Sequence, residues 1–283
     1  MTMPIFARAA ELRAFLAGPR RNSQRIALVP TLGNLHAGHY SLVDLARTRA
    51  DVVVATVFVN PTQFGPNEDF ARYPRTPDAD AKGLAEHGCA ALLMPAVEEM
   101  YPNGTHDNVR VSVPGLDAIL EGAVRPGHFD GVATIVAKLF NLVQPDVAVF
   151  GRKDYQQLLV ITRMARDLAY PIEIVGAPTA REANGLAMSS RNQYLDAAER
   201  EHAGLIHATL QRMRTAVLAG SSIDAIETMA STSLRDAGFE PDYAVIRRAT
   251  DLGFPGEERT GLIGLVAARL GSTRLIDNLL LDP

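Results

Sequence analysis

Along the first 180 residues, short continuous hydrophobic runs alternate with longer segments in which apolar residues recur at helical spacing. The continuous runs predict strands that are buried on both faces, at 25–30, 52–59, 90–94, 146–150 and 172–176. The helical spacing predicts helices at 36–50, 77–88, 129–143 and 154–169. Buried strands that alternate with helices are typical of a parallel sheet between two layers of helices. We therefore predict an α/β fold with a Rossmann-like, doubly wound parallel sheet.

The pattern changes after about residue 180. Two helical stretches come first, at 197–218 and 222–237. Segments with alternating apolar residues follow, at 242–249, 262–270 and 273–281. Gly271 and Ser272 separate the last two segments and predict a hairpin with a two-residue turn. We expect a larger domain at 1–180 and a smaller α+β C-terminal domain at 181–283, which share an interface and hinge around Pro178 to Asn184.

Composition narrows the class of protein. A chain of 283 residues with 47% hydrophobic content can bury a substantial core. Its formal net charge of −4 argues against a nucleic-acid-binding protein with a broad basic surface, so small anionic substrates would need local positive charge. The chain has neither a secretory signal nor an apolar run of about twenty residues. We expect no membrane association and a cytoplasmic location.

Some residues that often mark chemistry are assigned no role. The single cysteine, Cys89, excludes an internal disulfide and is typical of a reducing compartment. Its apolar surroundings predict that it packs at the start of a strand. Four histidines also have no assigned role, because their spacing is not that of metal ligands. They are His87, His106, His202 and His207.

The clearest chemical signal is a pair of histidines, His36 and His39, at the passage from the first strand to a helix. Pro30 ends the strand, and Gly33 and Asn34 allow a tight bend before the helix. A helix start exposes unpaired backbone N–H groups and the positive end of the helix dipole, which suit a triphosphate. Two imidazoles on one face of the first turn can donate to phosphate oxygens. An ordinary helix start with incidental histidines is the alternative.

Polar residues also follow other strands, and ligands of parallel sheets bind beyond the carboxyl ends of strands. Asn60 and Gln63 follow the second strand, and their amides can both donate to and accept from a substrate with hydroxyl and carboxylate groups. Gly151 to Asp154 and Gln157 follow the fourth strand. Lys153 can neutralise a phosphate, and Asp154 can cap a helix or accept from a ribose hydroxyl. For each amide taken alone, a turn or surface residue is the favoured interpretation, and only the shared placement after the strands favours a binding role.

A further polar cluster spans Gly185 to Asn192, near the expected domain junction. Its Ser189, Ser190 and Arg191 form a set of donors suited to phosphate. A serine loop that caps the following helix is the alternative. Arg125 places one more cationic donor ahead of a helix. The chain has neither a Walker loop nor a G-x-G-x-x-G fingerprint, so a nucleotide would be bound through a different sequence motif.

These blocks together resemble a known family. Pro30 to His39 resembles the HIGH element of class I aminoacyl-tRNA synthetases and related nucleotidyltransferases, and Met188 to Arg191 resembles their KMSKS element. With these two, the blocks Asn60–Phe64, Tyr73–Pro77 and Gly151–Gln157 are similar to pantoate–β-alanine ligases, also called pantothenate synthetases. The similarity runs in order over nearly the whole chain.

The resemblance implies an AMP-forming acid–amino-acid ligase that joins (R)-pantoate to β-alanine. ATP is then a substrate, pantoyl adenylate the intermediate, and pantothenate, AMP and pyrophosphate the products. It further implies Mg²⁺ bound with ATP, a homodimer, an ATP- and pantoate-binding domain at 1–180 and a lid domain at 181–283. We leave the protein ligands of Mg²⁺ unassigned, with Asp78 and Asp80 as the candidates.

The family's functional positions are carried over residue by residue. The nucleotide contacts fall on Leu32, Gly33, Asn34, Leu35, His36, Ala37, Gly38, His39, Gly151, Arg152, Lys153, Asp154, Ala180, Met188, Ser189, Ser190 and Arg191. The pantoate and β-alanine contacts fall on Gln63, Gln157, Asn60 and Arg125. The catalytic positions are His39, as proton donor, with His36 and Lys153. Arg152 stands where a glutamate is often found and Ala180 where a valine is common, and either could alter ATP affinity.

Two other functions remain open at this point. One is another HIGH-motif nucleotidyltransferase, of the adenylyl- or cytidylyltransferase kind, against which the Asn60/Gln63 and Lys153/Gln157 blocks argue. Release of pyrophosphate that depends on pantoate would separate the two. The other is a nucleotide-sensing or scaffold protein, which would bind ATP without turnover.

Overall fold

The computed structural model describes residues 3–66, 68, 70–257 and 259–282. Two compact units make up the chain. The first comprises Met1–Arg152 with Gln156–Pro178, and the second comprises Lys153–Tyr155 with Thr179–Pro283. Within the described residues, no helix is both long and apolar enough to cross a membrane.

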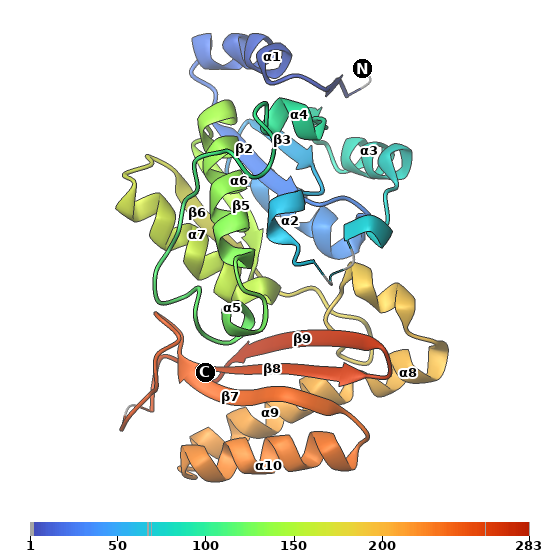
Figure 1. Cartoon of the computed structure of the whole chain (residues 1–283), viewed down its shortest axis with the longest axis vertical. Helices are drawn as coiled ribbons and strands as arrows, with labels where there is room; N and C mark the ends of the chain where they lie inside the picture. The colour runs from blue at the N-terminus through green and yellow to red at the C-terminus, as the bar shows by residue number, and fades with distance from the viewer. Residues whose placement is uncertain (1–2, 67, 69, 258, 283) are drawn as a thin grey trace. The chain divides into compact units, whose positions relative to one another are not determined.

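A six-stranded sheet with every strand pair parallel forms the centre of the first unit (Figure 1). Its strands are β1 (Ile5–Phe6), β2 (Ile26–Thr31), β3 (Val52–Val57), β4 (Ala91–Leu93), β5 (Val147–Gly151) and β6 (Glu173–Ala177). All the strands that the hydrophobic runs predict are present, with ends shifted by one or two residues. β1 was not predicted, because a strand of two residues carries too short a pattern.

Helices cover both faces of this sheet, so the predicted fold class is confirmed. α2 (Ala37–Arg47) and α3 (Pro77–Glu86) pack on one face, where Val43 and Leu84 join side chains of β2 and β3. The opposite face carries α1 (Ala9–Arg21), α6 (His128–Val143) and α7 (Tyr155–Asp167), with Phe140 of α6 against Phe150 of β5. The predictions omitted α1. Gly18 and Pro19 in its last turn weaken the helical pattern there.

The strand order places the ends of β2 and β5 at the centre of the sheet. The order is β1-β4-β3-β2-β5-β6, so the chain runs from β2 toward one edge and from β5 toward the other. The loops after β2 and β5 therefore flank the point where the winding direction reverses. Ligands of open parallel sheets bind at this point.

Shorter helical pieces connect these elements. They are η1 (Pro61–Gln63), η2 (Phe70–Arg72), α4 (Val97–Met100), α5 (Glu121–Val124) and η3 (Arg152–Asp154). Cys89 precedes β4 and is buried, with its Sγ donating to the carbonyl oxygens of Val53 and Ala91. Burial raises the pKa of this thiol to about 11, which confirms the predicted packing role.

The second unit contains a three-stranded antiparallel sheet in the order β7-β8-β9. Its strands are β7 (Glu240–Arg248), β8 (Leu262–Leu270) and β9 (Thr273–Leu280), and its helices are η4 (Ser190–Tyr194), α8 (Ala197–His202), α9 (Leu205–Leu218) and α10 (Ile223–Asp236). α9 and α10 lie side by side along the sheet (Figure 1), and Leu210, Met213 and Ile226 share a core with the strands. The predicted hairpin is confirmed, because Leu270 pairs with Thr273 across the turn.

The single helix predicted at 197–218 is wrong, since the chain forms α8 and α9 with a break at Ala203 and Gly204. Asn184 explains the break. Its Nδ2 donates to the carbonyl oxygens of Arg200 and Glu201, 2.8 and 3.2 Å away, which satisfies two carbonyls of the last turn of α8. A Cβ on Gly204 would lie 2.6 Å from the carbonyl oxygen of Asn184, so only glycine fits at this contact.

Candidate active site

The loop between β2 and α2 is held by a buried carboxylate. Gly33 and Asn34 both have positive φ angles, of 90° and 51°, which turn the chain sharply after the strand. Asp80 of α3 accepts from the backbone N–H groups of Asn34 and Leu35, with N···O distances of 3.0 and 2.8 Å. Thr76 Oγ1 donates to the same carboxylate at 3.0 Å. Since Asp80 is 1% exposed and bonded on both oxygens, it positions this loop.

The first turn of α2 fixes the orientation of both candidate histidines. His36 is the N-cap, and its Nδ1 accepts from the backbone N–H of Gly38 at 3.1 Å. His39 Nδ1 accepts from the backbone N–H of His36 at 3.3 Å, and the ring centroids are 4.1 Å apart. An acceptor Nδ1 carries no proton, so each neutral ring carries its proton on Nε2. Both rings therefore present Nε2–H groups that can donate to an anionic oxygen.

The amides after β3 form a network in which Asn60 holds Gln63. Asn60 is fully buried, and its Nδ2 donates to Gln63 Oε1 at 3.2 Å and to the carbonyl oxygen of Gly131 at 3.1 Å. Tyr101 Oη and Thr62 Oγ1 donate to Asn60 Oδ1 at 2.7 and 3.1 Å. Because Asn60 is saturated by these bonds, its geometry favours a positioning role. Gln63 is left with Nε2 as the donor for a ligand.

Arg125 belongs to a second, partly buried network beside Gln63. It forms a two-bond ion pair with Glu68, at 2.7 and 2.5 Å, and its Nη1 donates to His128 Nε2 at 3.0 Å. His128 Nδ1 donates to the carbonyl oxygen of Gln63 at 2.7 Å. Burial and the positive charge of Arg125 lower the pKa of His128 to about 4, so this ring is neutral near pH 7. Arg125 and His128 thus fix the backbone of Gln63.

Neighbouring glutamines of α7 have different environments. Gln156 is 4% exposed, and its Nε2 donates to the carbonyl oxygens of Leu116 and Ile119 at 2.6 and 2.8 Å. Its Oε1 accepts from the backbone N–H of Glu121 at 3.1 Å, so its polar atoms serve the fold. Gln157 is half-buried and points elsewhere on the helix. The polar atoms of Gln156 are therefore committed to the fold. Gln157 is the glutamine that we predict to bind substrate.

Of the residues at the end of β5 and just after it, Gly151 and Arg152 belong to the first unit, and Lys153 and Asp154 belong to the second. Gly151 is the last residue of β5 and pairs with Ala177. Arg152 lies over Gly176 of β6, where a Cβ would come within 3.2 Å of its Cγ and Nε. Lys153 is the first residue of η3 that belongs to the second unit. Its Nζ lies 3.4 Å from Asp154 Oδ1, and its side chain is 18% exposed. Lys153 thus keeps a largely shielded ammonium group, whereas Asp154 is exposed.

The segment Met188–Arg191 forms a tight turn in the second unit. The backbone N–H of Met188 donates to the carbonyl oxygen of Ala180 at 2.9 Å. Ser189 is the N-cap of η4, and its Oγ accepts from the backbone N–H of Arg191 at 3.2 Å. Asn192 closes the turn by donating to Glu182 Oε1 and to the carbonyl oxygen of Ala187. Ser189, Ser190 and Arg191 remain half-buried.

The predicted site residues belong to both units. The first unit contains Leu32, Gly33, Asn34, Leu35, His36, Ala37, Gly38, His39, Asn60, Gln63, Arg125, Gly151, Arg152 and Gln157, and the second contains Lys153, Asp154, Ala180, Met188, Ser189, Ser190 and Arg191. Direct contacts join His36 to His39, Asn60 to Gln63, and Ala180 to Met188.

Sequence reasoning missed the residues that hold these groups in place. Asp80 was considered only for a metal, and His128 was assigned no role. Asp277 and Asn278 were not noted at all, although two adjacent polar residues inside an apolar alternating segment are a detectable signal. Both are buried in β9.

The low pKa of His128 predicts a specific loss of stability in acid. The unfolded chain binds a proton on this histidine below its ordinary pKa of 6.5, whereas the folded protein does so only below about 4. The free energy of unfolding should therefore fall as the pH drops from 6.5 to 4, by up to about 3 kcal/mol from this group. His128→Asn keeps a donor near Nδ1 but cannot titrate. Urea unfolding of both proteins across this range should show a shallower decline for the variant, and parallel curves would contradict the assignment.

Comparisons with known proteins identify the family of this chain. The family described as pantoate-beta-alanine ligase matches residues 4–280. A pantothenate synthetase from Xanthomonas euvesicatoria pv. vesicatoria (strain 85-10) is 60% identical over 269 residues, which are 95% of this chain and 96% of the relative. A pantothenate synthetase from Stenotrophomonas maltophilia (strain K279a) is 59% identical over 268 residues, again 95% of this chain and 96% of the relative.

Solved structures extend the similarity to the fold. A pantothenate synthetase from Thermus thermophilus matches with a TM-score of 0.93 and 49% identity, over 99% of this chain and 100% of that chain. Pantoate-beta-alanine ligase from Francisella tularensis, solved in complex with β-γ ATP and β-alanine, matches with a TM-score of 0.81 and 31% identity, over 99% of this chain and 98% of that chain. The match of the family over nearly the whole length shows that this chain belongs to the pantoate–β-alanine ligases.

Proposed function

We propose that this protein condenses (R)-pantoate with β-alanine in two steps at the residues described above. In the first step, a pantoate carboxylate oxygen attacks the α-phosphorus of ATP, the bond to the β-phosphate oxygen breaks, and pyrophosphate leaves. In the second step, the amine of β-alanine attacks the carbonyl carbon of pantoyl adenylate, and AMP leaves. Adenylation is needed because a free carboxylate is a poor acyl donor.

The observation that carries this proposal is the arrangement of His36 and His39. Both Nε2–H groups are presented at a helix start beside the point where the winding of the sheet reverses. Negative charge grows on the α-phosphate and on the departing pyrophosphate during adenylation. Donors held in place beforehand stabilise this charge more in the transition state than in the bound substrates. We assign His39, the position that the resemblance gives to the proton donor, and His36 as hydrogen-bond donors to phosphate oxygens through their Nε2–H groups.

The other predicted groups take supporting parts. Lys153, Ser189, Ser190 and Arg191 would bind phosphate oxygens, which is the lid role that we propose for residues 181–283. Leu32 to Leu35, Gly151, Arg152, Asp154, Ala180 and Met188 would contact the rest of the nucleotide. Gln63 and Gln157 would hold pantoate through donors and acceptors of their amides. Asn60 would position Gln63 through its direct bond to the side chain, and Arg125 would do so through His128.

Mg²⁺ would enter bound to the phosphates of ATP. Among the residues that the structure describes, no group of three or more His, Cys, Asp or Glu side chains could hold a metal ion. Asp80 is occupied by N–H and O–H donors, and Asp78 is exposed at the start of α3. A cation that keeps water and phosphate ligands suits such a site, since Mg²⁺ is commonly bound through substrate phosphates. We further propose a cytoplasmic homodimer.

The direct test supplies the substrates in different combinations. Pyrophosphate should appear with MgATP and pantoate alone, at no more than one equivalent per site in a rapid phase. AMP and pantothenate should accumulate only when β-alanine is added. A nucleotidyltransferase of another kind would release pyrophosphate with a different acceptor and without pantoate. ATP binding without any pyrophosphate release would support the nucleotide-sensing alternative and reject the proposal.

Substitution of His39 can separate its chemistry from its capping contact. Asparagine at this position keeps an acceptor near the place of Nδ1 but lacks the Nε2–H donor. We expect His39→Asn to lower the single-turnover rate of adenylation by about a hundredfold or more, and to change the Kd for ATP only slightly. His39→Gln, which can place an N–H near Nε2, should recover part of the rate. Rapid-quench measurement of pyrophosphate checks both variants, and an unchanged rate for His39→Asn would remove the assigned role.

The two glutamines of α7 offer a matched pair for the substrate assignment. Gln157→Ala should raise the KM for pantoate by about tenfold to a hundredfold, because a hydrogen bond to a carboxylate is lost, and should leave the Kd for ATP unchanged. Gln156→Ala should instead lower the melting temperature, since it leaves buried carbonyl groups without donors. Steady-state kinetics and thermal unfolding of both variants are the measurements. Normal pantoate use by Gln157→Ala would show that another residue holds the substrate.

A further inference from the structure

Adjacent polar residues of β9, Asp277 and Asn278, are both buried. They are 5% and 7% exposed, in a strand whose other buried positions include Leu275. A buried carboxylate and a buried amide are costly unless partners satisfy them. The partners of this pair therefore show what the pair is used for.

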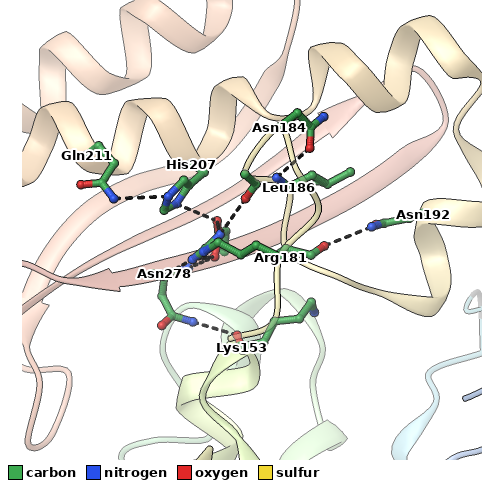
Figure 2. A network of polar contacts seen from close by, with 11 residues as sticks. Lys153, Arg181, Asn184, Leu186, Asn192, His207, Gln211 and Asn278 are labelled. Carbon is green, nitrogen blue, oxygen red and sulfur yellow. Dashed lines mark hydrogen bonds and ion pairs between the residues drawn. The ribbon is translucent and has the colours of Figure 1, made fainter. Parts of the chain in front are cut away.

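Asn278 fixes the main chain of Lys153. Its Nδ2 donates to the carbonyl oxygen of Lys153 at 2.8 Å, across 125 residues of sequence (Figure 2). The backbone N–H of Asn278 donates to Asp277 Oδ1 at 2.7 Å, which holds the two residues together. The bond to the carbonyl oxygen sets the orientation of the peptide plane that follows Lys153 Cα. The reach of the ammonium group depends on where this Cα lies.

Asp277 fixes the segment that leads to Met188–Arg191. Arg181 donates to both carboxylate oxygens of Asp277, with Nη1 at 2.6 Å and Nη2 at 3.0 Å. Arg181 Nη1 also donates to the carbonyl oxygen of Gly185 at 3.0 Å, and its backbone is bridged to Ala187. Figure 2 shows the Arg181 side chain extending toward Asn278, beside the loop that carries Leu186. One carboxylate thus ties the turn that bears the serines and Arg191 to β9.

A neutral histidine lies beside this ion pair. His207 Nδ1 is 3.9 Å from Asp277 Oδ2, and Gln211 Nε2 donates to His207 Nε2 at 3.2 Å (Figure 2). Burial and the positive charge of Arg181 lower the pKa of His207, so its ring is uncharged near pH 7. The charge of Asp277 is therefore balanced by Arg181 and not by His207. The charge of Arg181 is neutralised by Asp277 through two hydrogen bonds. Because these donors are used within the protein, Arg181 is suited to fixing the position of the segment that carries it.

We propose that β9 positions the phosphate-binding groups of the second unit, and that Asn278 is the positioning residue of Lys153. This inference rests on the proposed role of Lys153 toward ATP. Neither Asn278 nor Asp277 touches substrate in this proposal. Asn278 acts through the main chain of Lys153, and Asp277 acts through Arg181. A displacement of about 1 Å in a group that stabilises developing charge is enough to slow a reaction strongly.

A double-mutant cycle tests the link between Asn278 and Lys153. The variants are Asn278→Ala, Lys153→Ala and the double variant, and the readout is the rapid-quench rate of pyrophosphate release from MgATP and pantoate. We expect Asn278→Ala to lower this rate by about tenfold to a hundredfold in the wild-type background. In the Lys153→Ala background it should have no further effect. An equal factor in both backgrounds, or no effect in the wild-type background, would overturn the inference.

Further readouts separate positioning from simple loss of structure. Reaction of added pantoyl adenylate with β-alanine should be slowed much less by Asn278→Ala than adenylation is, because no pyrophosphate leaves in this step. Arg274→Gln is the matched control, since Arg274 of β9 forms an ion pair of 2.7 Å with Asp242 of β7. It should lower the melting temperature without changing the rate per folded molecule. If it slows adenylation as much as Asn278→Ala does, the effect belongs to the integrity of the strand and the inference is wrong.

The failure of this inference is distinguishable from the failure of the proposed function. If the wild-type protein releases no pyrophosphate with MgATP and pantoate, the proposed function fails and the inference falls with it. If the wild-type protein is active and Lys153→Ala is slow, additive behaviour of Asn278→Ala rejects the positioning role alone. Asn278→Ser, whose hydroxyl is too short to reach the carbonyl oxygen of Lys153, provides the same test if the alanine variant does not fold.

Discussion

The chemistry that the site can perform depends on the hydrogen bonds that the first turn of α2 makes to its own histidines. Backbone N–H groups of a helix start must find acceptors, and in this protein the Nδ1 atoms of His36 and His39 are those acceptors. The same bonds decide which nitrogen of each ring carries the proton. A capping contact that contributes to stability therefore also prepares two Nε2–H donors. Asp80 also fixes the loop that leads to this helix start, so both donors are held in place before a ligand binds.

Buried polar side chains bonded to main-chain groups recur wherever a predicted functional residue is held. Asp80 holds the loop before His36, and Asn278 holds the carbonyl oxygen of Lys153. Asn60 and His128 hold the side chain and the main chain of Gln63, respectively. Each of these groups is nine-tenths buried or more, so an unsatisfied atom would be costly and the observed geometry is strongly preferred. In the proposed function, the precision of the candidate site is thus supplied by residues that position other groups and do not themselves bind substrate.

The sequence was sufficient to predict elements and positions whose signal is local, and insufficient where the signal depends on partners far along the chain. Continuous apolar runs located the larger strands, because a strand that is buried on both faces has no polar side to show. The break between α8 and α9 was not predicted, because it depends on Asn184, a residue outside the helix. Gln156 and Gln157 look alike in sequence, and only the tertiary bonds of Gln156 assign it to the fold. Asn278 was missed for the same reason, since its partner Lys153 lies 125 residues away.

The Nε2–H donors of His36 and His39 at a helix start have a consequence for the balance between binding and catalysis. A fixed cation attracts a triphosphate before the reaction as well as during it, and such uniform attraction adds little to the rate. An N–H donor held toward the place where charge develops strengthens as that charge grows, so it favours the transition state. In the proposed function, His36 and His39 have the second of these tasks, and Lys153 and Arg191 have the first. A protein with a net charge of −4 can then bind a triphosphate with few cations, because backbone N–H groups and the dipole of α2 supply the remaining attraction.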